Sequence, residues 1–240
     1  MFGLITMLLS TLGATGMGSM LKIVGGFVQS RNEAKEAQEK RELVRDMQII
    51  INEEQDQIKK IKDLQLKCLE AAEKLIYNIQ NRDDIISDRE IAEKILLLLE
   101  RGSVSFNPQA SIYDELKYTG STKLIKSKNF RYALSRTYDN LNSRNMSVSR
   151  IIDDYFFQAI ARVNKHIIIF SKENRENDVT VYSDLIPTDF IIDKSFYYSN
   201  SFLGDLNQLK NLIERYLDML DKLESSYNYL KIYSEEELNK

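Results

Sequence analysis

Residues 206–230 read LNQLKNLIERYLDMLDKLESSYNYL, and their apolar side chains recur at alternating spacings of three and four. Such a heptad pattern is typical of a helix that packs along its length against another long helix. The positions that carry the pattern are Leu206, Leu209, Ile213, Tyr216, Leu220, Leu223, Tyr227 and Leu230. We therefore predict a helix over about 201–237 that forms the C-terminal part of the fold.

A second apolar stripe, between Met47 and Ile79, marks the expected partner of this heptad helix. Residues 29–81 contain neither Pro nor Gly and are rich in Ala, Glu, Lys, Gln, Arg and Leu, which favour a helix. The sequence leaves two interpretations open. Either the two stripes pack antiparallel within one chain, or the heptad helix forms a homo-oligomer with a second copy.

The first 28 residues, MFGLITMLLSTLGATGMGSMLKIVGGFV, form an almost uncharged apolar leader. No charge occurs between Phe2 and Leu21, and about 20 apolar residues suffice to cross a bilayer core of roughly 30 Å. We therefore predict a single-pass membrane anchor that contacts the lipid bilayer through residues 2–28. A cleaved signal peptide is disfavoured, because no basic residue precedes the apolar run. A buried or interfacial helix is the open alternative, favoured by the glycines and by Lys22.

The segment that follows the leader is polar on all sides and basic. It is predicted to be a helical neck over 29–45, whose Glu36 and Lys40 stand at the favourable i,i+4 spacing. Basic residues near a membrane mark the cytoplasmic side, which places the C-terminal side of the anchor in the cytoplasm. These basic residues are Lys22, Arg31, Lys35, Lys40, Arg41 and Arg45.

Composition indicates an all-α protein. Charged residues make up 29% of the chain, which contains 2 Pro and no Trp. We expect an N-terminal transmembrane helix that continues into a long helix, packed with the C-terminal heptad helix and several shorter helices. The predicted domains are an anchor (1–28), a neck (29–45) and a helical domain with a long antiparallel helix pair (46–240). A net charge of −3 gives no reason to expect nucleic acid as a partner.

The middle of the chain predicts shorter helices. Ser87 and Glu90 fit a capping box for a helix over 88–100, and Gly102 is expected to cap its C-terminus. The next helices are predicted over 111–117 and 129–142, with Gly120 in the turn between them. A further helix is predicted from Ser147 to Phe170. Residues 171–200 are predicted to form a loop in which two short apolar pieces, VTVY and DFII, dock as extended segments.

The sequence contains no recognisable catalytic motif. One cysteine, Cys68, excludes an intramolecular disulfide, and its position on the apolar stripe predicts a small core residue. One histidine, His166, lies in an apolar run and is interpreted as structural, because a lone histidine supplies neither a multi-His metal site nor a catalytic triad. We therefore predict no catalytic, cofactor-binding or metal-binding residues, and no enzyme.

Clusters of charge receive a similar interpretation. Acidic neighbours on a helix point apart and are expected to form solvated faces and caps. These pairs are Glu53-Glu54, Asp83-Asp84 and Asp153-Asp154. A local basic cluster could bind anionic headgroups if the domain folds back toward the membrane, and otherwise forms a solvated face. This cluster consists of Lys117, Lys123, Lys126, Lys128 and Arg131.

The order of these features resembles an uncharacterised family of single-pass, membrane-anchored helical proteins common in Bacteroidota. The resemblance covers roughly Gln29 to Leu141 and consists mainly of packing residues, so it implies architecture and not chemistry. The matching residues are Phe106, Tyr113, Glu115, Leu116, Gly120, Leu124, Ile125, Leu134 and Tyr138. The leader departs from this pattern, because such proteins begin with a basic segment that would place the domain outside the cytoplasm. The Gly-rich MGSMLKIVGGF instead resembles the starts of some phage-encoded membrane or particle-associated proteins.

Two functions are therefore expected to compete. The first is a non-enzymatic, membrane-anchored helical scaffold for interaction or sensing. The alternative is a phage or prophage protein that acts on the membrane or is associated with the particle.

Overall fold

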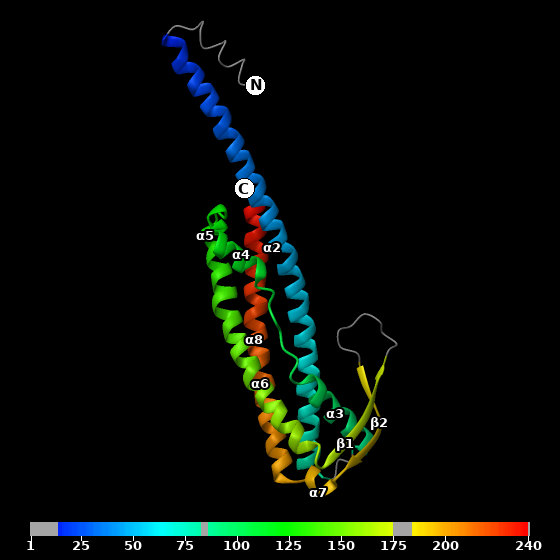
Figure 1. Cartoon of the computed structure of the whole chain (residues 1–240). Helices are drawn as coiled ribbons and strands as arrows, with labels where there is room; N and C mark the ends of the chain where they lie inside the picture. Colours follow the sequence, from blue (N-terminus) through cyan, green and yellow to red (C-terminus); the bar gives the residue numbers. More distant parts are fainter. Residues whose placement is uncertain (1–13, 83–85, 175–183, 240) are drawn as a thin grey trace.

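The computed structural model describes residues 14–82, 86–174 and 184–239, and it describes side chains over 33–82, 86–172 and 185–239. The described chain is predominantly helical, with one small two-stranded sheet (Figure 1). Its elements are α2 (Ala14–Gln80), α3 (Asp88–Arg101), α4 (Ser111–Thr119), η1 (Ser121–Leu124), α5 (Lys128–Leu134), the π-helix η2 (Ser135–Leu141), α6 (Asn142–Val163), β1 (Ile167–Asn174), β2 (Asp184–Ile192), α7 (Lys194–Tyr197) and α8 (Asn200–Leu238).

The long helices α2 and α8 pack antiparallel and form the spine of the bundle. All eight heptad positions of α8 are buried, and they face a buried stripe on α2 that includes Ile58, Ile61 and Leu75. Polar side-chain pairs, which we call rungs, cross one side of the interface. From rung to rung the residue number decreases on α2 while it increases on α8, as expected for antiparallel helices. These rungs join Glu73 to Lys210 (2.9 Å), Lys62 to Asp221 (2.6 Å) and Gln55 to Asn228 (2.7 Å).

Helix α2 extends well beyond its partner. It contains 67 residues, which at about 1.5 Å per residue gives a rod of roughly 100 Å. Its first buried side chain in the described region is Val44, whereas the side chains of residues 33–39 are all exposed. The N-terminal part of α2 therefore projects out of the end of the bundle at which α8 finishes (Figure 1).

A third long column of the bundle is formed by α5, η2 and α6 without a break. The sequence predicted two separate helices here, ending at Asn142 and beginning at Ser147, and this division is wrong. The π-helix η2 carries the chain from α5 into α6. Asn145, near the start of α6, is buried, and its side-chain amide donates to the backbone oxygen of Phe106 at 2.8 Å.

The predicted helix from Ser147 to Phe170 is also wrong at its C-terminal end. Helix α6 ends at Val163, and residues 167–174 form β1, which pairs antiparallel with β2. The segment expected to be a loop therefore contains part of a β-hairpin. Strand β2 includes the apolar piece DFII, but VTVY, the other such piece, lies outside the described residues.

Buried and exposed side chains alternate at the start of β1, as expected for a strand with one face on the core. Ile167 is buried, whereas Ile168 is exposed, because successive side chains point to opposite faces. The face that includes Ile167 packs toward the core, and β2 contacts α3. Pro187 is accommodated because the register shifts beside it, between Phe170 and Ser171.

Local capping signals were read correctly. Ser87 Oγ accepts from the backbone N–H of Glu90 at 3.2 Å and caps α3. Gly102 caps its C-terminus with a right-handed backbone, and glycine is needed there because a Cβ would overlap the ring of Phe156. Gly120 ends α4 with a φ of 70°, a left-handed conformation that favours glycine.

Candidate functional site

The bundle end from which α2 emerges is held together by a buried carboxylate. The side chain of Glu237, near the end of α8, is fully buried. Its Oε1 lies 2.8 Å from Lys40 Nζ and accepts the backbone N–H of Lys126 at 2.7 Å, while Oε2 accepts that of Ser127 at 3.1 Å. We call these four residues the collar, because they join α2, α8 and the start of α5 at one point.

The charge of Glu237 is set by its partners. Burial raises the pKa of its carboxyl group, but the Lys40 ammonium and the two backbone amides lower it, and the net pKa lies below the usual value. Glu237 is therefore a carboxylate at neutral pH. The Lys40 side chain is only 12% exposed, so each charge is the other's principal compensation.

A cavity of about 230 Å³ lies beside the collar. It is enclosed by α2 on one side and by η1 and the end of α8 on the other. Its charged lining is mixed. Glu33, Glu36, Lys40 and Arg41 come from α2, Lys123 and Lys126 from the chain around η1, and Glu237 from α8.

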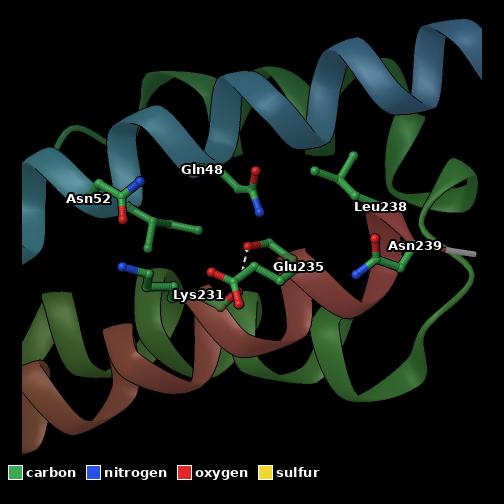
Figure 2. Close-up of a pocket in the computed structure, with 8 residues that line it drawn as sticks. Gln48, Asn52, Lys231, Glu235, Leu238 and Asn239 are labelled. Carbon is green, nitrogen blue, oxygen red and sulfur yellow. Dashed lines mark hydrogen bonds between the residues drawn. The ribbon is translucent and has the colours of Figure 1, made fainter.

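A second cavity, of about 290 Å³, lies in the groove between α2 and α8. Figure 2 shows Gln48 and Asn52 extending from α2 and Lys231 and Glu235 from α8. This position continues the row of polar rungs beyond Gln55 and Asn228, but no rung joins the four side chains across the groove among the described residues. The groove is a polar, solvent-accessible notch near the same end of the bundle as the collar.

The acidic pair Glu53-Glu54 is not a solvated face, which corrects the sequence interpretation. Glu54 is fully buried. Its Oε1 accepts the backbone N–H of Gln109 at 2.6 Å, and its Oε2 accepts the hydroxyl of Tyr138 at 2.8 Å. Burial raises the pKa of Glu54, and the hydrogen bonds from Tyr138, Gln109 and Tyr227 only partly offset this effect. Asp83-Asp84 lies outside the described residues.

Further buried polar groups bind the loop between α3 and α4. Gln65 Nε2 donates to the backbone oxygen of Val104 at 2.8 Å and of Gly102 at 3.3 Å. Tyr216 accepts the backbone N–H of Phe106 through its hydroxyl at 2.6 Å. These side chains replace the hydrogen bonds that a loop without secondary structure lacks. The sequence analysis missed these residues, because the residue type alone does not show whether a Gln or Glu on a helix is buried or exposed.

The two chemically distinctive residues differ in burial, because Cys68 lies in the core and His166 is exposed. Cys68 is buried, as expected, and burial raises the pKa of its thiol to about 12. His166 stacks on Phe196 with ring centroids 4.2 Å apart, and its Nδ1 lies 3.1 Å from Asp193 Oδ2. Asp193 also caps α7 through Ser195 and Phe196. In the described parts of the chain, no group of three or more His, Cys, Asp or Glu side chains could hold a metal ion.

The basic cluster divides into two parts. Lys117 is paired with Asp139 at 2.8 Å, and Arg131 donates to the backbone oxygen of Ile125. Lys123, Lys126 and Lys128 are exposed, and within the described chain no carboxylate lies within ion-pair distance of them. Three of the five cations are therefore available to a partner.

Glu54 predicts a pH dependence of stability. Because its folded pKa is raised above the usual 4.5, it contributes stability below that value, and this contribution is lost as the pH rises through the folded pKa. The slope reaches at most about 1.4 kcal/mol per pH unit. We expect Glu54→Gln to remove this loss. In urea unfolding, the free energy of unfolding of the variant should therefore rise relative to that of the wild type as the pH increases from 4.5. Glu53→Gln, at the exposed neighbour, should follow the wild type, and parallel curves for Glu54→Gln would contradict the assignment.

The predicted anchor, residues 2–28, lies outside the residues whose side chains the structure describes, which begin at residue 33. Within the described residues, none of the helices combines the length and the apolarity that a bilayer crossing requires. Searches of protein-family models, of curated proteins and of solved structures found no match to the chain. The resemblance to the membrane-anchored Bacteroidota family therefore stays a prediction.

Proposed function

We propose that this protein is a non-enzymatic, membrane-anchored helical scaffold, in which one helix connects an N-terminal anchor to a cytoplasmic bundle. The observation that carries the proposal is α2, which runs without interruption from Ala14 to Gln80 and leaves the bundle at the collar. An isolated helix gains no stability from tertiary packing, so a projecting segment needs either self-supporting side chains or a partner.

The neck supports itself through local pairs. Lys35 and Glu39 lie 3.5 Å apart at i,i+4, and Gln38 Nε2 donates to Glu42 at 2.9 Å. Each such pair adds only about 0.2–0.5 kcal/mol to a helix in water, but the surface of residues 33–39 is exposed and largely polar, so it requires no apolar cover. The neck is therefore suited to cross water between a membrane and the bundle.

The leader differs from the neck in its chemistry. Residues 14–28 of α2, ATGMGSMLKIVGGFV, carry Lys22 as their one charge, and the chain before them is likewise uncharged after Met1. An apolar surface of this length is unfavourable in water and favourable in a bilayer. The basic flank that begins at Arg31 supports an orientation with the bundle in the cytoplasm.

The internal polar groups support a structural role. Glu237, Glu54 and Gln65 are fully buried, and each joins segments far apart in the chain. Groups arranged in this way stiffen the junctions of a scaffold. The collar couples the direction of α2 to that of the bundle, so a displacement of the anchor would be passed to the bundle as a whole.

Membrane fractionation with C-terminal reporters tests the proposal. A reporter active only in the cytoplasm should give signal in the membrane pellet, and one active only outside should give none. Leu12→Arg places a charge near the centre of the predicted span, at a cost of about 2.5–3.5 kcal/mol, and should shift the protein to the soluble fraction. Ser30→Arg adds the same charge outside the span and should leave the protein in the pellet.

Two outcomes would overturn parts of this proposal. A wild-type protein found wholly in the soluble fraction would remove the anchor. Signal from the external reporter alone would retain the anchor and reverse the orientation.

A further inference from the structure

We propose that the tip of the bundle around η1 and α5 is a second membrane contact, which binds the phosphates of anionic phospholipids. The tip consists of Tyr118, Lys123, Lys126, Lys128 and Tyr132. This inference rests on the proposed function, because the anchor brings the tip close to a bilayer. It adds a lipid class and a set of residues that the anchor does not require.

The tip combines the two side-chain types that favour a membrane surface. Tyr118 is 91% exposed and Tyr132 is 70% exposed, whereas most large aromatic side chains of the described chain are packed. Tyrosine suits the interface because its ring accepts an apolar environment while its hydroxyl stays hydrated. The three lysines are exposed and have no carboxylate within ion-pair distance among the described residues.

The collar fixes the tip at the end of the bundle that faces the leader. The backbone N–H groups of Lys126 and Ser127 bind Glu237, which binds Lys40 of α2. The tip therefore lies level with Lys40 along the rod, and Figure 1 shows α4 and α5 at the end from which α2 projects. The hairpin lies at the opposite end.

The neck is short enough for the lysines of the tip to interact with the charged membrane surface. Lys40 lies twelve positions after Val28, which corresponds to about 18 Å of helix. The headgroup layer occupies roughly 5–7 Å of that length. The remaining gap, spanned in part by lysine side chains, is comparable to the Debye length of about 8 Å at physiological ionic strength. A moderate tilt of the rod, such as the 20° average of membrane helices, brings one side of the bundle closer still.

Local charges leave the tip attractive to anions. Lys40 and Glu237 compensate each other, and Glu33 and Glu36 share their wall of the adjoining cavity with Arg41. The three exposed lysines of the tip therefore leave an excess of positive charge. Each lysine near an anionic surface increases the population of the bound state by about fivefold. Three lysines together are therefore sufficient to favour the docked orientation when anionic lipid is present.

A single tryptophan can report docking, because the chain contains none. Tyr118→Trp places the probe at the tip, where the side chain is almost fully exposed and its replacement disturbs no packing. Tyr77→Trp, at a 55% exposed position near the far end of α2, lies about 55 Å further along the rod and serves as the matched probe. The full chain is reconstituted into phosphatidylcholine vesicles with or without phosphatidylglycerol, each with a nitroxide-headgroup lipid as quencher, and each sample is floated.

We expect quenching of the Tyr118→Trp probe to rise at least about twofold when phosphatidylglycerol is present, and to return to the neutral-vesicle value at 1 M salt. Adding Lys123→Gln, Lys126→Gln and Lys128→Gln should abolish the rise. The control triple Lys59→Gln, Lys60→Gln and Lys67→Gln, at exposed positions on α2, should preserve it. The Tyr77→Trp probe should show no rise.

Flotation separates failure of this inference from failure of the anchor. Protein that floats with both vesicle types but shows equal quenching overturns the tip contact and retains the anchor. Protein that floats only with anionic vesicles, with a quenched probe at the tip, supports the tip contact and removes the anchor. Protein that floats with neither type overturns both.

Discussion

Glu237→Ala should lower the free energy of unfolding by about 3–5 kcal/mol. The substitution leaves the Lys40 ammonium, whose side chain is only 12% exposed, without its carboxylate. It also leaves the backbone N–H groups of Lys126 and Ser127 without their acceptor. Removal of one member of a buried pair is costly because the remaining charge is left desolvated.

Urea unfolding followed by circular dichroism measures this loss. Glu236→Ala is the matched control, because Glu236 is the exposed neighbour of Glu237 on α8. The folded pKa of Glu237 is lowered, so its contribution is present at neutral pH and is lost as the pH falls through that pKa. The difference in the free energy of unfolding between the wild type and Glu237→Ala should therefore become smaller at acidic pH. Equal stability of the two alanine variants at pH 7 would show that the collar does not hold the bundle end.

Leu223→Ala should cost about 2–5 kcal/mol, because it removes fully buried methyl groups and leaves a cavity. Leu223 is 0% exposed at the centre of the interface between α2 and α8. Lys222→Ala, at the exposed neighbouring position, should change stability by no more than about 0.5 kcal/mol. A loss below about 1 kcal/mol for Leu223→Ala would contradict the packing described here.

The same measurement addresses the two interpretations of the heptad helix. If α8 packs on α2 of its own chain, the urea midpoint of the wild type is independent of protein concentration. If a second copy supplied the partner, the midpoint would rise with concentration, because association stabilises the folded state by mass action. We expect an independent midpoint.

The collar links the two membrane proposals. It joins α2 to the bundle and also sets the level of the tip along the rod, through the contacts of Glu237 with Lys40, Lys126 and Ser127. Loss of Glu237 should therefore weaken control over the tip position before it affects the distant hairpin. With Glu237 in place, the anchor and the tip act as two attachments of one rigid body.

Helices, their caps and their apolar stripes could be predicted from the sequence. The ends of α3 followed from Ser87 and Gly102, and the seam of α8 from its heptad spacing. Each of these features depends on residues within one or two turns of each other, so the pattern appears directly in the sequence.

The β-hairpin and the buried glutamates could not be predicted in this way. Ile167 and Ile168 occupy opposite faces only because β2 returns beside β1, and the sequence ending at Phe170 fits a helix equally well. Glu54 is buried while Glu53 is exposed, because Gln109 and Tyr138 meet Glu54 from 55 and 84 residues away. Glu237 is distinguished from Glu236 by Lys40, almost 200 residues earlier in the chain.

Local periodicity thus specified α2 and α8 as long helices and which of their faces are apolar. Long-range packing selected the partner of each face, converted the end of the predicted α6 helix into a strand, and chose which of two adjacent carboxylates enters the core. The physical reason is the range of the interactions. Helical hydrogen bonds and caps join residues a few positions apart, whereas burial of a charge depends on partners that only the folded chain brings together.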